Sequence, residues 1–559
     1  MSLEGKRALI AAVRRVVFAG LIILGAWLVL VVLRGAIPAS IIYRMGIPSG
    51  SIEWDWSRSL WTGMPVAEMI RRRLGVTAQL LVLGGLLSLG VAGALLFIGV
   101  LISRATERTP WLARVRQVLR LVLVSGGVST PIFMVGTLFV VYSALWWGWS
   151  LPQTYKGLSW WPVFSVSLLP AWLLVQAGHG ELANWPGSPS VSYWVLVRHL
   201  SVRLVIRLLK LVGAIIVVTM LVEQIFALPG LGRLLIECLN QRDFPVVFGA
   251  AWVFVVIVVL VKLAAELLEI VYNHFGRPPV LSEHREEPAV PRTAIPRGWL
   301  IFCLVLVFVS IVLAIVGPAF APFGFNEISL VDRLASPSAG HILGTDNLGR
   351  DVFSRLLFGI RIDILAGFMF AGILSVVAAG WAMLAAYLRK VNNWLGDTLE
   401  DVVMLPRDII CAFPWLVLLL LWMSIVEPGF IPVALIGSLV LLPRAVGMMQ
   451  EAYRSPPEGR HWLYGVLWSI PVMFLFAVAG GILYTSSLSY LGFGIPPPTA
   501  ELGNILSGAG LIYMLQAPWM AQWPSICLVL LLLVWVMAGD ALLERLGFRS
   551  KAVWAKAVE

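Results

Sequence analysis

Long apolar stretches alternate with shorter polar segments along almost the whole chain. Most of the apolar stretches are near the length of about 20 residues that a helix needs to cross the hydrocarbon of a bilayer. Twelve candidate spans lie near 16–33, 77–101, 121–145, 161–176, 204–225, 246–271, 299–316, 363–388, 405–425, 430–447, 466–488 and 524–543. The pattern predicts an all-α polytopic membrane protein with about 12 transmembrane helices.

The twelve spans form two sets of six with the same layout. Each set has one span, then a long polar loop (34–76 and 317–362), then five more spans. The segment between the sets is rich in proline and charge and cannot span a bilayer. We therefore predict a first half at 1–271, a cytoplasmic linker at 272–298 and a second half at 299–559. Two related halves are typical of transporters with a pathway between them.

Composition agrees with this class. The 559 residues are 59% hydrophobic and only 13% charged, with a mean hydropathy of +0.90, whereas soluble domains have about 25% charged residues. Most of the 41 lysines and arginines fall on the side of the N-terminus, with Arg71, Arg72 and Arg73 as exceptions. This distribution places both termini in the cytoplasm, and it explains the net charge of +11 without a nucleic-acid partner.

Several kinds of chemistry lack a sequence signal. The cysteines at 238, 303, 411 and 527 form no CxxC pair, and the six histidines are scattered. No phosphate-binding G-x-x-x-x-G-K-[ST] loop, HExxH or GxSxG motif occurs. The first span has no small-residue cleavage site after it and is expected to be retained. We therefore expect no enzymatic, cofactor or metal site in this chain.

The polar stretch His341–Arg361 lies between two apolar segments. Gly344 and Gly349 permit backbone angles that other residues resist, which predicts a compact turn between them. Asp351 can cap a short helix at Val352–Gly359 with one apolar face. The stretch is typical of a surface loop followed by an interfacial helix.

Helix breakers end one span in each half at equivalent places. Pro229, Gly230 and Gly232 follow the fifth span, and Gly492 and Gly494 follow the eleventh. Irregular backbone at such a place must lie near water or inside protein. Two interpretations remain open: a gate region, or a rigid re-entrant turn that caps the helices. Glu223 and Asp363 lie near outer ends of spans, where we expect water to reach them.

Motifs in the second half resemble the second permease subunit of dipeptide/oligopeptide/nickel ABC importers. The outer-loop signature GTD-x-x-GRD-V-x-S-R is present as Gly344, Thr345, Asp346, Gly349, Arg350, Asp351, Val352, Ser354 and Arg355. The segment from Leu488 to Gly503, with Ser489, resembles the LSFLGLG-type segment of the same subunit.

The first half resembles the partner subunit. Glu223–Arg233, with Phe226, matches its E-x-x-F-x-x-PGLGR segment, and Arg242–Val247 matches its RDYPVV segment. The chain is thus similar to both permease subunits fused into one.

The resemblance implies a permease component of an ABC importer in the cell membrane, for peptides or else nickel or other small solutes. ATP and magnesium would bind to separate cytoplasmic ATPase subunits, and an extracytoplasmic binding protein would deliver the substrate. The outer loop and breaker segments would organise the outer mouth, with Asp346, Arg350 and Asp351 fixing the turn or contacting a partner.

The ATPase-coupling loops depart from the family pattern EAA-x-x-x-G. In the first half Glu181, Ala183 and Gly187 keep its spacing, but prolines intrude. In the second half Glu451 and Ala452 begin the motif, and Gly459 comes two positions late. Proline disfavours a continuous helix there, so the docking elements are expected to be abbreviated. A plain connecting loop is the other interpretation.

A secondary transporter driven by an ion gradient is the alternative to an ABC permease. Twelve spans in a 6+6 layout also fit the major facilitator pattern. That pattern, however, requires a D-x-x-G-R-type motif between the second and third spans, and residues 103–117 have none.

Overall fold

The computed structural model describes residues 3–37, 57–106, 134, 138, 142, 160–183, 193–276, 297–389, 393–454, 462–507, 513 and 516–546. Within these residues the chain is helical, and the only strand-like pairing is two isolated β-bridges. The predicted all-α class is confirmed.

The helices of the first half are α1 (Leu3–Gly35), α3 (Val66–Thr106), α6 (Trp160–Ala183), α7 (Tyr193–Lys210), α8 (Val212–Ile225), α9 (Leu231–Asn240) and α10 (Phe244–Val271), followed by the π-helical turn η1 (Tyr272–Gly276). The second half contains α12 (Arg297–Val316), the 3-10 turns η2 (Gly317–Phe320) and η3 (Leu330–Asp332), α13 (Val352–Leu388), α14 (Asn393–Cys411), α15 (Trp415–Met423), α16 (Phe430–Arg454), α17 (Trp462–Tyr490), α18 (Leu502–Ser507) and α20 (Trp519–Arg545).

Eight of the described helices are long and apolar enough to cross a membrane, namely α1, α3, α10, α12, α13, α16, α17 and α20. Two bent pairs, α7 with α8 and α14 with α15, bring the number to ten if each pair is one span. The apolar part of α6, Trp160–Val175, is shorter. The predicted span at 121–145 lies outside the described residues except at 134, 138 and 142. A polytopic membrane protein is confirmed, and the number twelve stays a prediction.

Two predicted spans are not continuous helices. The span expected at 204–225 bends by 62° at Leu211, and the one expected at 405–425 bends by 80° before Trp415. At the second break Pro414 has no N–H to continue the helix. At the first break the amphipathic α7, which carries Arg203, Arg207 and Lys210, meets α8, which is apolar except for Thr219, Glu223 and Gln224. The change in polarity favours a change in direction where the chain enters the apolar layer.

Corresponding helices of the two halves have corresponding neighbours. The first helix of each half packs against the last, as α1 against α10 and α12 against α20. The second helix packs against the fourth span, as α3 against α6 and α13 against α16. Contacts between the halves run from α14 to α1 and from α15 to α8 and α10. This repeat supports the predicted two-half organisation.

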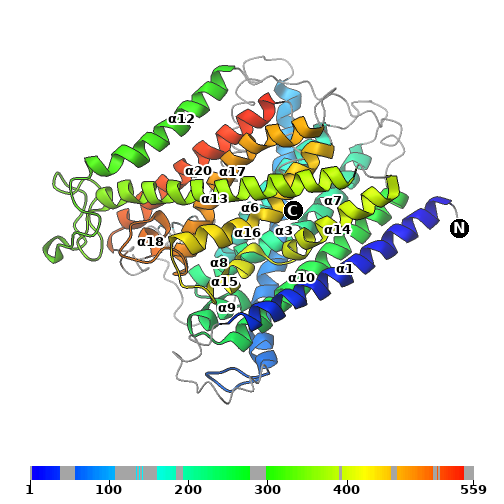
Figure 1. Ribbon diagram of the computed structural model, residues 1–559, viewed down its shortest axis with the longest axis horizontal. Helices are drawn as coiled ribbons and strands as arrows, with labels where there is room; N and C mark the ends of the chain where they lie inside the picture. Colours follow the sequence, from blue (N-terminus) through cyan, green and yellow to red (C-terminus); the bar gives the residue numbers. More distant parts are fainter. Residues whose placement is uncertain are drawn as a thin grey trace.

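Most helices run side by side in Figure 1, with the N-terminus at the right and α9, α18 and the segment between α12 and α13 toward the left. We call the end that holds residues 317–351 the loop end, and the end that holds Arg14 and Arg15 the N-terminal end. Polar contacts join residues of the same end. Arg15 reaches Glu266 (3.4 Å) at the N-terminal end, and Trp519 Nε1 donates to Thr345 O (3.1 Å) at the loop end.

Candidate functional site

The Asp346 carboxylate is the centre of the signature loop. It accepts the backbone N–H groups of Leu348 (2.8 Å) and Arg350 (2.9 Å). It also accepts Arg350 Nε (2.7 Å) and Arg355 Nη1 (3.3 Å). Only 6% of Asp346 and 9% of Arg350 is exposed. The predicted surface loop does not expose these side chains, because a carboxylate and two guanidiniums pair inside the protein and fix the turn.

Gly344 and Gly349 are required by the backbone. Their φ angles are +78° and +73°, in the region that side chains resist. A Cβ on Gly349 would lie 1.7 Å from the carbonyl oxygen of Ser329. Thr345 lies between the glycines, donates to Asp332 O and accepts Ala335 N (2.8 Å). The sequence-based prediction of a glycine-dependent turn is confirmed.

Asp351 caps a helix, as predicted, by accepting Ser354 N (2.7 Å), while His341 Nδ1 lies 3.0 Å from its other oxygen. The helix is not short. It continues from Val352 to Leu388 as α13, so the predicted stop at Gly359 is wrong. Gly359 is tolerated inside the helix because it lies against Leu502 at close range.

The first breaker segment encloses Glu223, at the end of α8. Glu223 accepts Thr77 Oγ1 (2.6 Å) and Arg233 N (3.0 Å) and is fully buried. A Cβ on Gly230 would lie 2.0 Å from the carboxyl carbon of Glu223, and one on Gly232 would lie 2.8 Å from Met220 Cα. Glycine is thus needed for close approach at both positions.

The flanking residues complete this first junction. Phe226 caps α8 and is buried, and Pro229 is half-buried one residue before the cap of α9. Cys238 on α9 is also buried, and desolvation and the neighbouring Asp243 raise the pKa of its thiol to about 12. We call residues 223–233 with Thr77 the first junction.

The second breaker segment encloses two acids. Leu488 and Ser489 are buried in the last turn of α17, and Gly492, with φ of +89°, ends that helix. A Cβ on Gly494 would lie 2.1 Å from Ser489 Oγ, which accepts Ile495 N (3.0 Å). Glu501 accepts the N–H groups of α18, and Asp363 of α13 accepts Leu502 N (3.2 Å). We call residues 486–504 with Asp363 the second junction.

The expectation that water reaches Glu223 and Asp363 is wrong. Both carboxyls are 0% exposed, because α9 and α18 fold back over them. The sequence pattern predicted the ends of the spans but did not predict α9 and α18, because both helices are short. The contacts that Thr77 and Glu501 make with these helices could not be predicted for the same reason.

The coupling segments are described in part. Glu181 and Ala183 lie in the last turn of α6, and Glu451 and Ala452 lie in the last turn of α16. Ala452 is buried, and its carbonyl oxygen lies 2.2 Å from where a Cβ on Gly465 would be. Gly187 and Gly459 lie outside the described residues, so the abbreviated coupling helix stays a prediction.

Glu400 of α14 was missed by the sequence analysis. It is buried, and one of its carboxylate oxygens accepts Gln450 Nε2 (2.8 Å), Tyr453 Oη and Arg454 Nη2 (2.8 Å). All three donors lie at the end of α16, beside Glu451 and Ala452. Glu400 therefore holds in place the helix end that enters the predicted second coupling segment.

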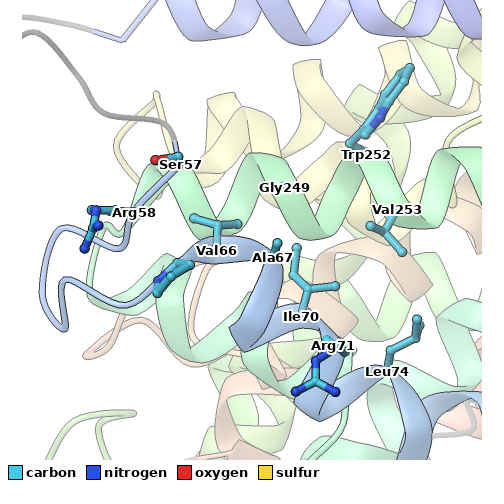
Figure 2. A pocket seen from close by; sticks show the side chains of 11 residues that line it. Ser57, Arg58, Val66, Ala67, Ile70, Arg71, Leu74, Gly249, Trp252 and Val253 are labelled. Atoms are coloured by element: carbon cyan, nitrogen blue, oxygen red, sulfur yellow. The ribbon is translucent and has the colours of Figure 1, made fainter.

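A groove of about 630 Å³ lies between the start of α3 and α10. Figure 2 shows Ile70 and Leu74 from α3 and Trp252 and Val253 from α10 along it, with Arg58 and Arg71 at its side. Apolar walls with arginines beside them are typical of a membrane interface and not of reaction chemistry.

Other candidate chemistry is limited within the described residues. The four cysteines carry free thiols. No group of three histidine, cysteine, aspartate or glutamate residues in the described ranges could hold a metal ion.

Comparison with known proteins finds permease proteins of transport systems. No protein-family model matches the chain. The chain is 31% identical over 294 residues to the dipeptide transport system permease protein of Haemophilus influenzae, covering 47% of this chain and 97% of that protein. It is 30% identical over 250 residues to the glutathione transport system permease protein of Pectobacterium atrosepticum (41% and 80%). It is 26% identical over 267 residues to a dipeptide transport system permease protein of Alkalihalophilus pseudofirmus (44% and 85%).

Proposed function

This chain belongs to the family of peptide-type ABC transporter permeases, and on that premise we propose that it forms the whole membrane pathway of an ABC importer for peptides. The observation that carries the proposal is the match to a dipeptide permease over 97% of that protein but only 47% of this chain. A relative that accounts for half of the chain leaves room for a second permease unit. We infer that the chain contains both units.

The repeat in the fold supports this inference. Each half has a first and last helix in contact and a short helix folded over a buried acid at the loop end. The two junctions would form the outer gate of the pathway. Their burial and close glycine contacts favour a gate that moves by shifting packed helices and not by bending a loose loop.

The orientation follows from the charges. We infer that the N-terminal end faces the cytoplasm, since the positive-inside excess lies there. The coupling segments near Glu181 and Glu451 would then dock on cytoplasmic ATPase subunits, and the loop end would receive an extracytoplasmic binding protein. ATP and magnesium would bind to the ATPase subunits, because this sequence contains no phosphate-binding loop.

Co-purification tests the proposal. The intact chain, extracted in mild detergent from cells that express it with its partners, should bring down ATPase subunits and a substrate-binding protein. The purified chain alone should hydrolyse no ATP. ATPase activity that persists after removal of every partner would contradict the proposal. So would uptake that an uncoupler abolishes and ATP does not affect, which would favour an ion-coupled transporter.

A further inference from the structure

Thr77 and Asp363 occupy equivalent positions in the two halves. Each lies eleven residues after the first residue of its helix, α3 from Val66 and α13 from Val352. Each accepts the first N–H of the short helix that covers its junction. Thr77 Oγ1 accepts Leu231 N (2.7 Å), and Asp363 Oδ2 accepts Leu502 N (3.2 Å).

The first junction uses one hydroxyl and one carboxyl. Thr77 Oγ1 accepts a hydrogen bond from α9 and donates one to Glu223 Oε1 (2.6 Å). The other oxygen of Glu223 accepts Arg233 N (3.0 Å). The hydroxyl is therefore both acceptor and donor, and each carboxylate oxygen has a donor.

The second junction has a carboxyl where the first has a hydroxyl. Asp363 and Glu501 are both 0% exposed and lie close enough to interact. Glu501 accepts Gly503 N (2.9 Å) on one oxygen and Asn504 N (2.8 Å) on the other. Two such donors suit an ionised carboxylate. Asp363 Oδ1, in contrast, is buried without a hydrogen bond of standard geometry, although Ser486 lies nearby.

Among the described residues, no cation compensates the negative charge that Asp363 would add beside Glu501. Arg361, two residues from Asp363, is exposed, and Arg355 at the start of α13 is bound to Asp346. On the packed helices, Arg444 of α16 donates to Tyr484 of α17 (3.3 Å), and α20 presents the Cys527 thiol. Two adjacent buried carboxyls cannot both be charged without a large cost.

We propose that Asp363 holds a proton and, as a neutral carboxylic acid, supplies the hydroxyl that Thr77 supplies in the first half. Its O–H is directed to Glu501, while its other oxygen accepts the N–H of Leu502. Asp363 is thus a positioning residue that holds α18 on α13. The protonation of Asp363 is inferred from the geometry of the second junction alone, and only the link to gating rests on the proposed function.

Loss of this proton would loosen the second junction. An ionised Asp363 would repel Glu501 and could no longer donate to it. The hold on α18 is therefore present while Asp363 is protonated and is lost as the pH rises, whereas the hydroxyl of the first junction does not change with pH.

Infrared difference spectroscopy on the full chain in lipid nanodiscs tests the proton directly. The wild type minus Asp363→Thr should show, at pH 7, the C=O stretching band of a protonated carboxylic acid, with the shift expected in D₂O. Glu327→Gln is the matched control, because Glu327 is exposed and should contribute no such band. A wild-type spectrum identical to that of Asp363→Thr in this region would overturn the proposal.

A second measurement tests the equivalence to a hydroxyl. The apparent unfolding temperature of the wild type should decrease at alkaline pH, when Asp363 loses its proton. Asp363→Thr should unfold near the wild-type temperature at neutral pH and should not show this alkaline decrease. Asp363→Ala should lower that temperature by several degrees at every pH. Equal damage by Thr and Ala would overturn the proposal. If the infrared band is present but no form of the chain supports ATP-driven uptake, the proposed function is wrong, while the protonation of Asp363 is still supported.

Discussion

At the scale of single residues, the signature loop is fixed from within. Asp346 holds Arg350 and Arg355 together in a site that little solvent reaches. Motif residues that point inward act on a partner only through the shape of the loop. Of the two roles that the sequence left open for Asp346 and Arg350, fixing the turn is the one that their burial supports.

Removal of Arg350 should therefore disrupt the loop. Arg350→Ala leaves a buried carboxylate with only Arg355 as its charged partner, and breaking a buried pair costs about 3 kcal/mol. We expect faster proteolysis within residues 317–351 and strongly reduced uptake, with membrane insertion unchanged. Arg361→Ala, at an exposed position on α13, the helix that follows the loop, should have little effect. Normal uptake and normal protease resistance in Arg350→Ala would show that the pairing is dispensable.

A glycine substitution tests the turn itself. Gly349→Ala combines a left-handed φ, which costs a residue with a side chain about 1 to 2 kcal/mol, with a collision against the Ser329 carbonyl. Gly340→Ala is the control, because the nearest atom to its Cβ would be 4.0 Å away. We expect Gly349→Ala to lower the apparent unfolding temperature and Gly340→Ala to leave it unchanged. Equal values for both variants would contradict the observed turn.

At the scale of elements, the end of α16 is held by a neighbouring helix. Glu400 of α14 joins Gln450, Tyr453 and Arg454, which surround the start of the second coupling segment. A rigid connection is what a coupling segment requires to transmit motion. No sequence motif indicates it, because Glu400 lies 50 to 54 residues before its partners.

Weakening this connection should reduce coupling. Glu400→Gln removes the charge that Arg454 and Tyr453 bind, at a cost of up to about 2 kcal/mol. In the assembled transporter we expect several-fold less uptake for each ATP hydrolysed. Asp401→Asn is the matched control, since the adjacent Asp401 pairs with the exposed Arg14 and such pairs contribute little. An unchanged ratio of uptake to hydrolysis in Glu400→Gln would exclude a coupling role.

Hydropathy predicted the elements better than their bends. The eight continuous spans follow from apolar length alone, and the Asp351 cap follows from local hydrogen bonding. The bend at Leu211 could not be predicted in this way, because hydropathy does not show that the cationic residues of α7 pair with Glu269 and Asn273 in the folded chain. The same limit applies to Thr77 and Glu223, which are 146 residues apart and meet only in the folded chain.

At the scale of the whole molecule, the two halves hold together through helix contacts. α14 packs on α1, and α15 packs on α8 and α10. A Cβ on Gly25 of α1 would lie 2.5 Å from Ile409 of α14, which shows how closely these helices approach. The Gln522 side chain of α20 donates to Tyr142 of the first half.

The linker should therefore be dispensable after folding. A protease site inserted between residues 277 and 296 should be cut without separating the halves. We expect both fragments to co-elute in size-exclusion chromatography and uptake to remain near that of the uncut protein. Dissociation on cleavage would show that the linker, and not the helix contacts, joins the halves.

The most direct test of a peptide-importing ABC permease is uptake of a labelled dipeptide into proteoliposomes that contain the chain, its ATPase subunits and its binding protein. We predict accumulation that requires ATP, the ATPases and the binding protein, and that is unaffected by an uncoupler. Accumulation driven by an imposed ion gradient in vesicles without ATP or ATPases would contradict this account.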